Sequence, residues 1–477
     1  MGTLFNQSNK TSQAKPVLEN EEVKKYLSDF HSKFVVTLVD KTTNNISIVC
    51  KKFYILSILK EGGQWPGVGE VTYSKSNLSK TAVINKLRAG SKSFLNNERV
   101  DDIFYELPFM YAIVKMHKNP IKLRFIIASC KSPTKTLARV AMLGLSACEK
   151  QMERFCECIR NYSGINRFFI TNNFQKIARD IETLNCRATR KWISTFDFTS
   201  LYTKLTHELL KTNMGWYVDT AFKGAKTRGQ NFLSVYNFRA DWVTSHHGTT
   251  NSFDCATFKG VINFLINNAF FCFGDVVLRQ IVGIPMGLPP APQMANGTLQ
   301  KEEFAFQERM TKTNYAIAKS LNHTHRYIDD ITPLNDNGNF EKYFSQIYPA
   351  ELELNRENVG FESASVLEMN INVVENKFLI SMYDKREAFE FEVFRYPSFE
   401  SNVPSNTVYT TFFTQLIRIS RVCNFEEAFL IDSKKLANRF IKKGANIKIL
   451  KTYVKKFFAK YKVPYTNEGV CMTYVFG

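Results

Sequence analysis

The stretch HRYIDDI, from His325 to Ile331, is the most informative part of this sequence. It places two adjacent carboxylates, Asp329 and Asp330, between apolar residues, as a tight hairpin that holds a divalent metal ion would. A third acid, Asp197, lies upstream in ISTFDFTSLYT, where it follows a short apolar run that predicts a strand. A pair of aspartates on its own more often marks a solvated turn.

A Gly/Pro-rich segment, GIPMGLPPAP from Gly283 to Pro292, lies between the two acidic stretches. Its prolines stiffen a turn and exclude regular helix until about Gln293. The order is carboxylate, glycine-rich turn, carboxylate pair, with apolar flanks on both acids. This ordered combination favours a metal site over a solvated turn.

Three carboxylates fit a two-metal site for nucleotidyl transfer. Two magnesium or manganese ions about 3.5–4 Å apart can stabilise both the attacking and the leaving oxygen of a phosphoryl group. Such ions prefer hard oxygen ligands and keep much of their hydration. We expect Asp197 and Asp329 to be the bridging ligands and Asp330 to be auxiliary, because successive strand side chains alternate between faces.

These segments resemble a known family of enzymes. FDFTSLYT, RQIVGIPMGLPPAPQMANGTL (Arg279 to Leu299) and HRYIDDI resemble motifs A, B and C of reverse transcriptases, most closely those of Penelope-like retroelements, near telomerase reverse transcriptases. Further stretches share the likeness: LVDKTTNNISIVCKKFY (the DK motif), LPFMYAIVKMHKNPIKLRFIIAS (fingers), VLEMNINV and SMYDKREAFEF (palm end and primer grip) and FESNVPSNT (start of the thumb). The likeness covers roughly Asp40 to Lys460.

The resemblance implies an α+β right-hand polymerase with fingers, an antiparallel palm sheet, a helical thumb and an N-terminal region. It implies RNA-directed DNA synthesis from a DNA primer on an RNA template with dNTPs. The expected divisions are a flexible basic tail (1–20), an N-terminal region with the DK motif (21–106), fingers (107–190), a palm with motifs A to E (191–385) containing an insertion (207–258), and a basic helical thumb (386–477). The DK segment is expected to touch the template or to be an ordinary strand and turn.

The chain departs from the family pattern at three places. Met286 stands in motif B where many reverse transcriptases have Gln, and Val114 stands in the fingers where Pro is common. No GIY-YIG endonuclease domain follows the thumb. This suggests an endonuclease-lacking member of the type associated with chromosome ends, or a polymerase-only segment or domesticated gene.

The resemblance also implies a nucleotide site. Tyr202, five residues past Asp197, is expected under the incoming sugar, where its ring would collide with a 2′-hydroxyl and favour DNA synthesis; alternatively it is a core aromatic. The motif B residues Gly283, Met286 and Gly287 are expected beside the nucleotide, because glycine allows close backbone approach.

Basic residues of the fingers are expected to bind the triphosphate. Lys115, Lys118, Lys122 and Arg124 alternate with apolar residues around a turn. Arg124 is the strongest candidate, since a guanidinium grips phosphate oxygens in a bidentate manner. Lys115 ranks second, and Lys118 is also included. Alternatively these are solvated charges that protect an edge strand.

Composition favours a polyanionic partner. The 477 residues include 63 Lys and Arg against 44 Asp and Glu, a net charge of +19 that attracts nucleic acid. From Ser433 to Asn467 there is no acid, while Ile447, Leu450, Val454 and Phe457 recur at helical spacing. We expect this helix to grip duplex through Lys442, Lys443, Lys448, Lys451, Lys455 and Lys456; a solvated helical face is the alternative.

Other features exclude competing classes of protein. The most apolar stretch, Val261 to Val277, is interrupted by polar residues, so we expect a palm helix leading into motif B and no membrane span. The ten scattered cysteines predict reduced core thiols in an intracellular protein without a zinc site, and His246-His247 predicts a polar loop. We expect nuclear localisation, with a cytoplasmic protein as the alternative; oligomeric state is left open.

Two other functions compete with templated synthesis. One is untemplated or protein-primed nucleotidyl transfer on the same fold. The other is a catalytically silent, domesticated nucleic-acid-binding protein, which is disfavoured because all three predicted metal ligands are present. The natural template and primer source stay open at this stage.

Overall fold

The computed structural model describes residues 21–61, 72–95, 106–116, 120–246, 251–384 and 401–477, with residues 389, 391, 393, 396 and 399. The expected tail at 1–20, the predicted phosphate ligand Lys118 and the second histidine of the His246-His247 pair lie outside the described residues. Among the described helices, none combines the length and the apolar character needed to cross a bilayer.

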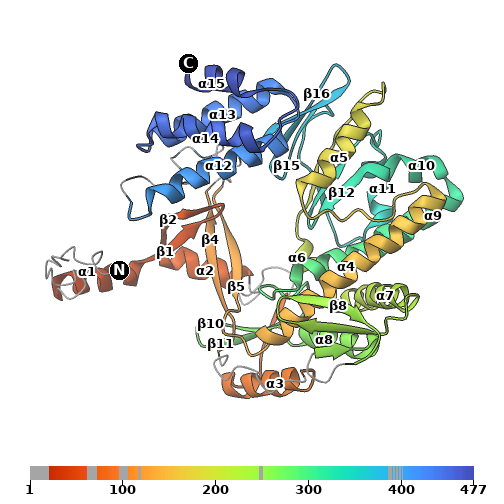
Figure 1. The fold of residues 1–477 in the computed structure, drawn as a ribbon. Coiled ribbons are helices and arrows are strands. Elements are labelled where there is room, and N and C mark those ends of the chain that lie inside the picture. Colours follow the sequence, from red (N-terminus) through yellow and green to blue (C-terminus); the bar gives the residue numbers. More distant parts are fainter. Residues whose placement is uncertain are drawn as a thin grey trace, which may run out of the picture.

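A seven-stranded sheet forms one side of the molecule (Figure 1), and two distant chain segments build it. The first supplies β1 (Phe34–Val39), β2 (Thr42–Cys50), β3 (Tyr73–Lys75), β4 (Phe109–Lys115) and β5 (Lys122–Ala128); the second supplies β10 (Phe270–Phe273) and β11 (Val276–Gln280). The alternation of β4 buries Met110, Ala112 and Val114. α2 (Lys51–Glu61) packs Tyr54 and Ile58 into the same core. Helices α1 (Glu21–Lys33) and α3 (Lys80–Lys92) complete this region.

Long helices form the main core of the chain. They are α4 (Lys135–Ser163), α7 (His207–Lys226), α8 (Cys255–Asn267) and α9 (Ala291–Thr313), beside a small sheet of β7 (Phe232–Tyr236), β8 (Arg239–Val243) and β9 (Asn251–Phe253). The segment 207–258, predicted as an insertion, packs into this core through Leu210, Met214 and Tyr217 of α7.

The prediction of one helix through Val261–Val277 is wrong. α8 ends at Asn267, and the rest forms the hairpin of β10 and β11. The Asn268 side chain donates to the Phe264 carbonyl oxygen at 2.8 Å and stops the helix. Gly274, at φ 56°, then makes the turn between two runs rich in β-branched and aromatic residues.

A four-stranded antiparallel sheet, which we call the palm sheet, runs in the order β12-β13-β6-β14. Its strands are β6 (Phe196–Phe198), β12 (Thr324–Tyr327), β13 (Asp330–Pro333) and β14 (Leu354–Arg356), with α5 (Phe174–Asn185), α6 (Leu201–Lys204), α10 (Tyr315–Ser320) and α11 (Asn339–Ile347) around it. Phe196 and Ile331 are buried on the side of the main core, so the hydrophobic pattern sets the register of the central pair.

The C-terminal region has a core of its own. After a three-stranded sheet of β15 (Ser363–Val366), β16 (Met369–Val374) and β17 (Lys377–Met382) come α12 (Ser405–Val422), α13 (Glu426–Ile441), α14 (Ile447–Lys460) and α15 (Glu468–Phe476). The predicted helix is present as α14, with Leu450, Val454 and Phe457 buried. Ile447 departs from the expectation, because it is 44% exposed in the first turn.

The ten cysteines are all free, and only half of them are core residues. The buried ones are Cys148, Cys156, Cys272, Cys423 and Cys471. Cys50, Cys130, Cys158 and Cys186 are exposed, so the expectation of core thiols holds only in part.

Candidate active site

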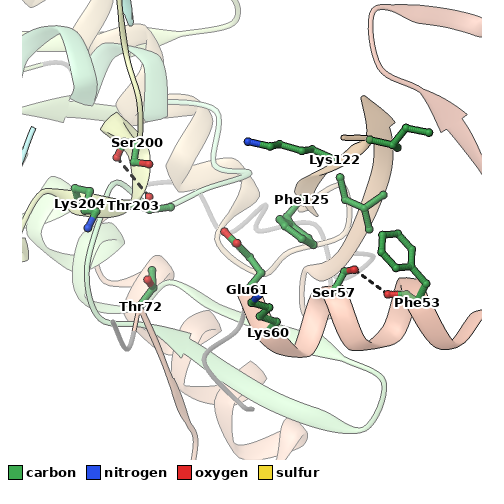
Figure 2. A pocket seen from close by; sticks show the side chains of 12 residues that line it. Phe53, Ser57, Lys60, Glu61, Thr72, Lys122, Phe125, Ser200, Thr203 and Lys204 are labelled. Atoms are coloured by element: carbon green, nitrogen blue, oxygen red, sulfur yellow. Dashed lines mark hydrogen bonds between the residues drawn. The ribbon is translucent and has the colours of Figure 1, made fainter. Parts of the chain in front are cut away.

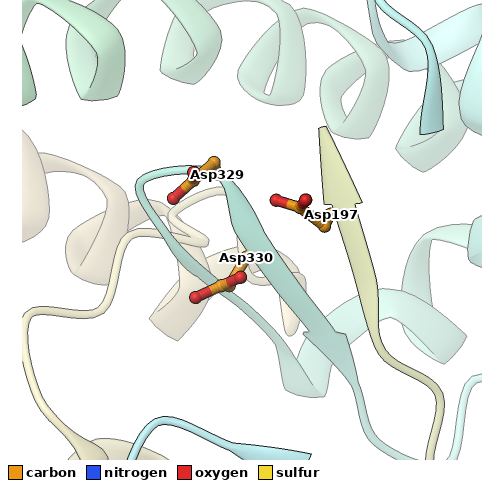
Figure 3. A group of neighbouring side chains, drawn as sticks. All are labelled: Asp197, Asp329 and Asp330. Carbon is orange, nitrogen blue, oxygen red and sulfur yellow. The ribbon is translucent and has the colours of Figure 1, made fainter. Parts of the chain in front are cut away.

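Three carboxylates meet at one edge of the palm sheet (Figure 3). Asp197 lies in the middle of β6 and pairs in register with Asp330, the first residue of β13. Asp329 lies in the turn between β12 and β13, and its carbonyl oxygen accepts from the Phe198 amide at 3.3 Å. Each residue offers an oxygen within 4.8 Å of the others, and all three are partly buried. The sheet register thus produces the convergence that the sequence predicted.

The geometry of the turn bears on the expectation that Asp330 is an auxiliary ligand. Ile328 adopts φ 57°, a left-handed conformation that is unusual for a β-branched residue. Because Asp329 is a turn residue, the alternation of strand side chains does not separate it from Asp330. Both neighbouring carboxylates therefore lie within reach of Asp197.

A buried arginine lies directly behind this turn. Arg326 of β12 is fully buried, and hydrogen bonds use all five of its N–H donors. Two donate to the equally buried carboxylate of Glu303 on α9, and two donate to Asn296. The fifth donates to the carbonyl oxygen of Ile328 at 3.2 Å. The network therefore holds the strained residue that precedes Asp329.

Further groups complete the network below the hairpin. The Tyr348 hydroxyl donates to Glu303 at 2.6 Å, and the Asn296 amide donates to Glu149 at 3.1 Å. Burial and the charge of Glu303 raise the pKa of Tyr348 well above its usual value. No local sequence pattern indicates this network, because the side chains that these hydrogen bonds join are 23 or more residues apart along the chain.

The donor set fits divalent cations. Oxygen ligands from several carboxylates suit magnesium or manganese, which complete their coordination with water and substrate phosphates. Like charges this close disfavour the ionised state unless a cation compensates them. Arg326, behind the hairpin, already uses its donors on other groups. Asp197, Asp329 and Asp330 are thus the residues that would hold such ions.

Tyr202 lies beside the carboxylates, as the resemblance implies. It belongs to the single turn of α6 that follows β6, and it is partly buried against the main core. Burial and the negative charge of Asp329 raise the pKa of Tyr202, so its phenol stays neutral. Its carbonyl oxygen accepts from the Ile284 amide at 2.9 Å, which ties α6 to the motif B turn.

The motif B glycines contact the protein itself. A Cβ on Gly283, at φ 91°, would lie 2.2 Å from the Tyr202 carbonyl oxygen. A Cβ on Gly287, at φ 77°, would lie 2.1 Å from the carbonyl oxygen of Ile127 in β5. Both glycines therefore let the turn pack closely on α6 and β5, and their predicted place beside a nucleotide stays a prediction.

Met286 is likewise placed by the protein core. Its side chain is partly buried against the cluster under the seven-stranded sheet, and its amide donates to Gln280 at 3.1 Å. The fully buried Gln280 also donates to the carbonyl oxygens of Val282 and Ile284, so one side chain shapes the whole turn. Sequence reasoning missed Gln280, because a glutamine before a turn has no distinctive pattern.

The fingers arginine has a partner that was not predicted. Arg124 on β5 forms an ion pair with Asp40 of the DK motif at 3.0 Å. The Asp40 side chain is 4% exposed, whereas that of Arg124 is 50% exposed. The DK segment forms a strand and a turn, with Lys41 at φ 66° between β1 and β2, and its contact with the template stays a prediction. Its aspartate orients Arg124, whose phosphate-binding role stays a prediction.

A cavity of about 530 Å³ separates α2 and β5 from α6 (Figure 2). Three lysines line it: Lys60 of α2, Lys122 of β5 and Lys204 of α6. The hydroxyl groups of Ser200 and Thr203, beside Tyr202, form part of the wall. Neither Lys60 nor Lys204 was predicted. The position of Lys204, two residues after Tyr202, could have indicated that it lies at the site.

The other predicted lysines fall into two groups. Lys115 ends β4 and lies close enough to Glu61 to oppose the rise that burial causes in the pKa of Glu61. On the C-terminal helices, Lys442, Lys448, Lys455 and Lys456 are exposed, while Lys443 and Lys451 are partly buried. The Lys443 ammonium donates to the Tyr396 carbonyl oxygen at 2.7 Å, so it is the least available of the six.

Comparisons with known proteins give distant structural matches. No known family matches the sequence, and no curated protein does. Telomerase from Candida albicans, solved with a TWJ fragment of telomeric RNA, is 11% identical, with a TM-score of 0.50 over 92% of this chain and 73% of that chain. Telomerase from Candida tropicalis is 12% identical, with a TM-score of 0.48 over 94% and 68%. The BmCPV RNA-dependent RNA polymerase reaches 0.41 at 10% identity over 87% and 31%.

The first of these matches shows the fold. It spans nearly the whole chain, so the likeness includes the seven-stranded sheet, the palm sheet and the C-terminal helices together. The predicted fold class, an α+β right hand with an antiparallel palm sheet and a helical thumb, is confirmed.

The buried ion pair of Arg326 and Glu303 allows a test of how the hairpin that carries the aspartates is stabilised. Arg326→Gln should lower the free energy of unfolding by about 3–5 kcal/mol, because it leaves a buried carboxylate unpaired. Urea denaturation followed by circular dichroism measures this. Arg167→Gln is the matched control with a smaller loss, since its partner Glu308 is 46% exposed and can be hydrated. Equal stability of Arg326→Gln and the unaltered protein would refute the role assigned to the pair.

Proposed function

We propose that this chain is an RNA-directed DNA polymerase, a reverse transcriptase that extends a primer 3′ end by two-metal nucleotidyl transfer. The observation that carries the proposal is the cluster of Asp197, Asp329 and Asp330, within 4.8 Å at the edge of the palm sheet. The fold shared with Candida albicans telomerase supports it. Bound magnesium or manganese ions would stabilise the attacking and leaving oxygens.

The protein's own side chains orient the substrates. Tyr202 lies beside the carboxylates, where its ring would exclude a 2′-hydroxyl and so favour dNTPs. Arg124, oriented by Asp40, and the lysines of the 530 Å³ cavity supply positive charge for a triphosphate. The exposed lysines at the end of α13 and on α14, namely Lys442, Lys448, Lys455 and Lys456, would hold the backbone of an RNA template and DNA primer.

The motif likeness extends the proposal to the chain's origin. It supports a Penelope-like retroelement enzyme that works in the nucleus. The Candida albicans telomerase was solved with an RNA fragment, which agrees with an RNA partner for this chain too.

Replacement of a central carboxylate tests the catalytic assignment. Asp329→Asn should lower extension of a DNA primer on an RNA template about 10³-fold or more, because metal stabilisation of the transition state contributes several kcal/mol. Gel analysis of the products measures extension, and filter binding measures affinity for the primer–template, which should change little. Asp275→Asn, an exposed aspartate in the turn between β10 and β11, is the control and should keep full activity.

The same assay separates templated from untemplated synthesis. On a homopolymer RNA template, the enzyme should incorporate only the complementary dNTP. Incorporation that ignores the template would support the competing nucleotidyltransferase.

Equal extension by Asp329→Asn and the unaltered protein would contradict the assignment of Asp329 as a ligand of the catalytic metal ions.

Tyr202 gives a test of sugar selection. Tyr202→Ala should reduce the preference for dNTPs over rNTPs about 10- to 100-fold, or roughly 1.4–3 kcal/mol, because the space for a 2′-hydroxyl opens. Ratios of kcat/KM for a dNTP and the matching rNTP measure this preference. Tyr202→Phe keeps the ring and should keep the preference. An alanine variant with unchanged discrimination would show that Tyr202 is only a core aromatic.

A further inference from the structure

A second basic pocket lies at the end of the palm sheet that is opposite to the aspartates. It has a volume of about 700 Å³, and we call it the outer basic pocket. Four cations from three segments line it: Arg160 in the last turn of α4, Arg187 and Arg190 after α5, and Lys319 of α10. All four are exposed. The pocket therefore brings together charges that are distant in sequence.

Positive charge is in excess in this pocket. Asp180 is the one carboxylate among its lining residues, and it already accepts from His323 at 3.0 Å and from His325 at 3.1 Å. Although burial opposes it, these hydrogen bonds hold the pKa of Asp180 well below its usual range. Within the described part of the chain, no ion pair engages Arg160, Arg187, Arg190 or Lys319. The four charges thus face the solvent without a carboxylate partner.

Aromatic rings accompany these cations. Tyr162, two residues past Arg160, is 93% exposed at the end of α4. The Arg190 guanidinium lies 4.5 Å from the centroid of the partly buried Trp192 ring. Tyr162 is outside the pocket, since it is not one of the lining residues, whereas Arg190 lines the pocket beside Trp192. Aromatic rings and cations together suit single-stranded nucleic acids, because bases stack on rings while phosphates pair with Arg and Lys.

The outer basic pocket is separate from the proposed active site. His323 lies just before β12, and the aspartates follow its other end, so the four residues of the strand, roughly 13 Å at 3.3 Å per residue, lie between them. In Figure 1, α5 and α10 lie on the right, away from α2 and β5 on the left. A strand in this pocket would be outside the space between fingers and palm.

We propose that the outer basic pocket binds single-stranded nucleic acid. Its phosphates would pair with Arg160, Arg187 and Arg190, while a base that lies beyond the pocket stacks on the exposed ring of Tyr162. The inference goes beyond the proposed polymerase, because the pocket would hold a strand that is not paired in the primer–template duplex. Binding there needs neither the aspartates nor metal ions, so it is tested independently of synthesis.

The test measures binding of a fluorescein-labelled 12-nucleotide oligo(U) RNA to the full chain by anisotropy. A saturating blunt RNA–DNA duplex is present to occupy the proposed active site. We expect the triple variant R160Q/R187Q/R190Q to lower the affinity about tenfold or more at 0.15 M salt, and to reduce the slope of log K against log salt by about 2. Tyr162→Ala should weaken binding about fivefold or more, whereas Tyr162→Phe should bind normally.

The control removes the same charge elsewhere. K25Q/K226Q/K377Q takes three exposed lysines from scattered positions and should leave binding within about twofold of the unaltered protein. Thermal melts check that all variants fold alike. Equal affinity of the two triple variants, or complete displacement of the RNA by the duplex, would overturn the proposal. Asp329→Asn should bind the RNA normally, so loss of synthesis and loss of this site are distinguishable.

Discussion

Three negative charges held within 4.8 Å are the constraint on which the rest of this structure depends. Carboxylates this close repel one another, so a rigid scaffold has to hold them together, and a bound cation would compensate their charge. The scaffold is the register of β6 against β13 together with the buried pair of Arg326 and Glu303. This geometry supports the proposed metal binding.

The motif B turn connects this scaffold to the seven-stranded sheet. Gly283 packs on the backbone of α6 and Gly287 packs on that of β5, while Gln280 holds the turn between them from inside. Since α6 carries Tyr202 and β5 carries Arg124, one turn sets the spacing of the residues proposed to contact sugar and phosphate. A side chain at either glycine would push these elements apart.

Local sequence patterns predicted the strands and helices of this site. They did not predict the contacts between residues that are far apart in the sequence. The apolar run before Asp197 predicted its strand, the apolar flanks of Asp329 and Asp330 predicted a hairpin, and helical spacing predicted α14. The pairing of Arg124 with Asp40, 84 residues away, has no local pattern. Neither does the contact of each motif B glycine with a distant backbone. Each of these depends on which segments meet, and a single sequence does not contain that information.

The central claim is that Asp197, Asp329 and Asp330 together bind divalent ions. Electron paramagnetic resonance of Mn²⁺, titrated into the chain with primer–template and a non-hydrolysable dNTP, counts the bound ions directly. Two Mn²⁺ ions should bind per chain, with a clear loss of bound Mn²⁺ in Asp197→Asn and no loss in Asp275→Asn. Binding that is absent, or that is the same in Asp197→Asn as in the unaltered protein, would contradict it.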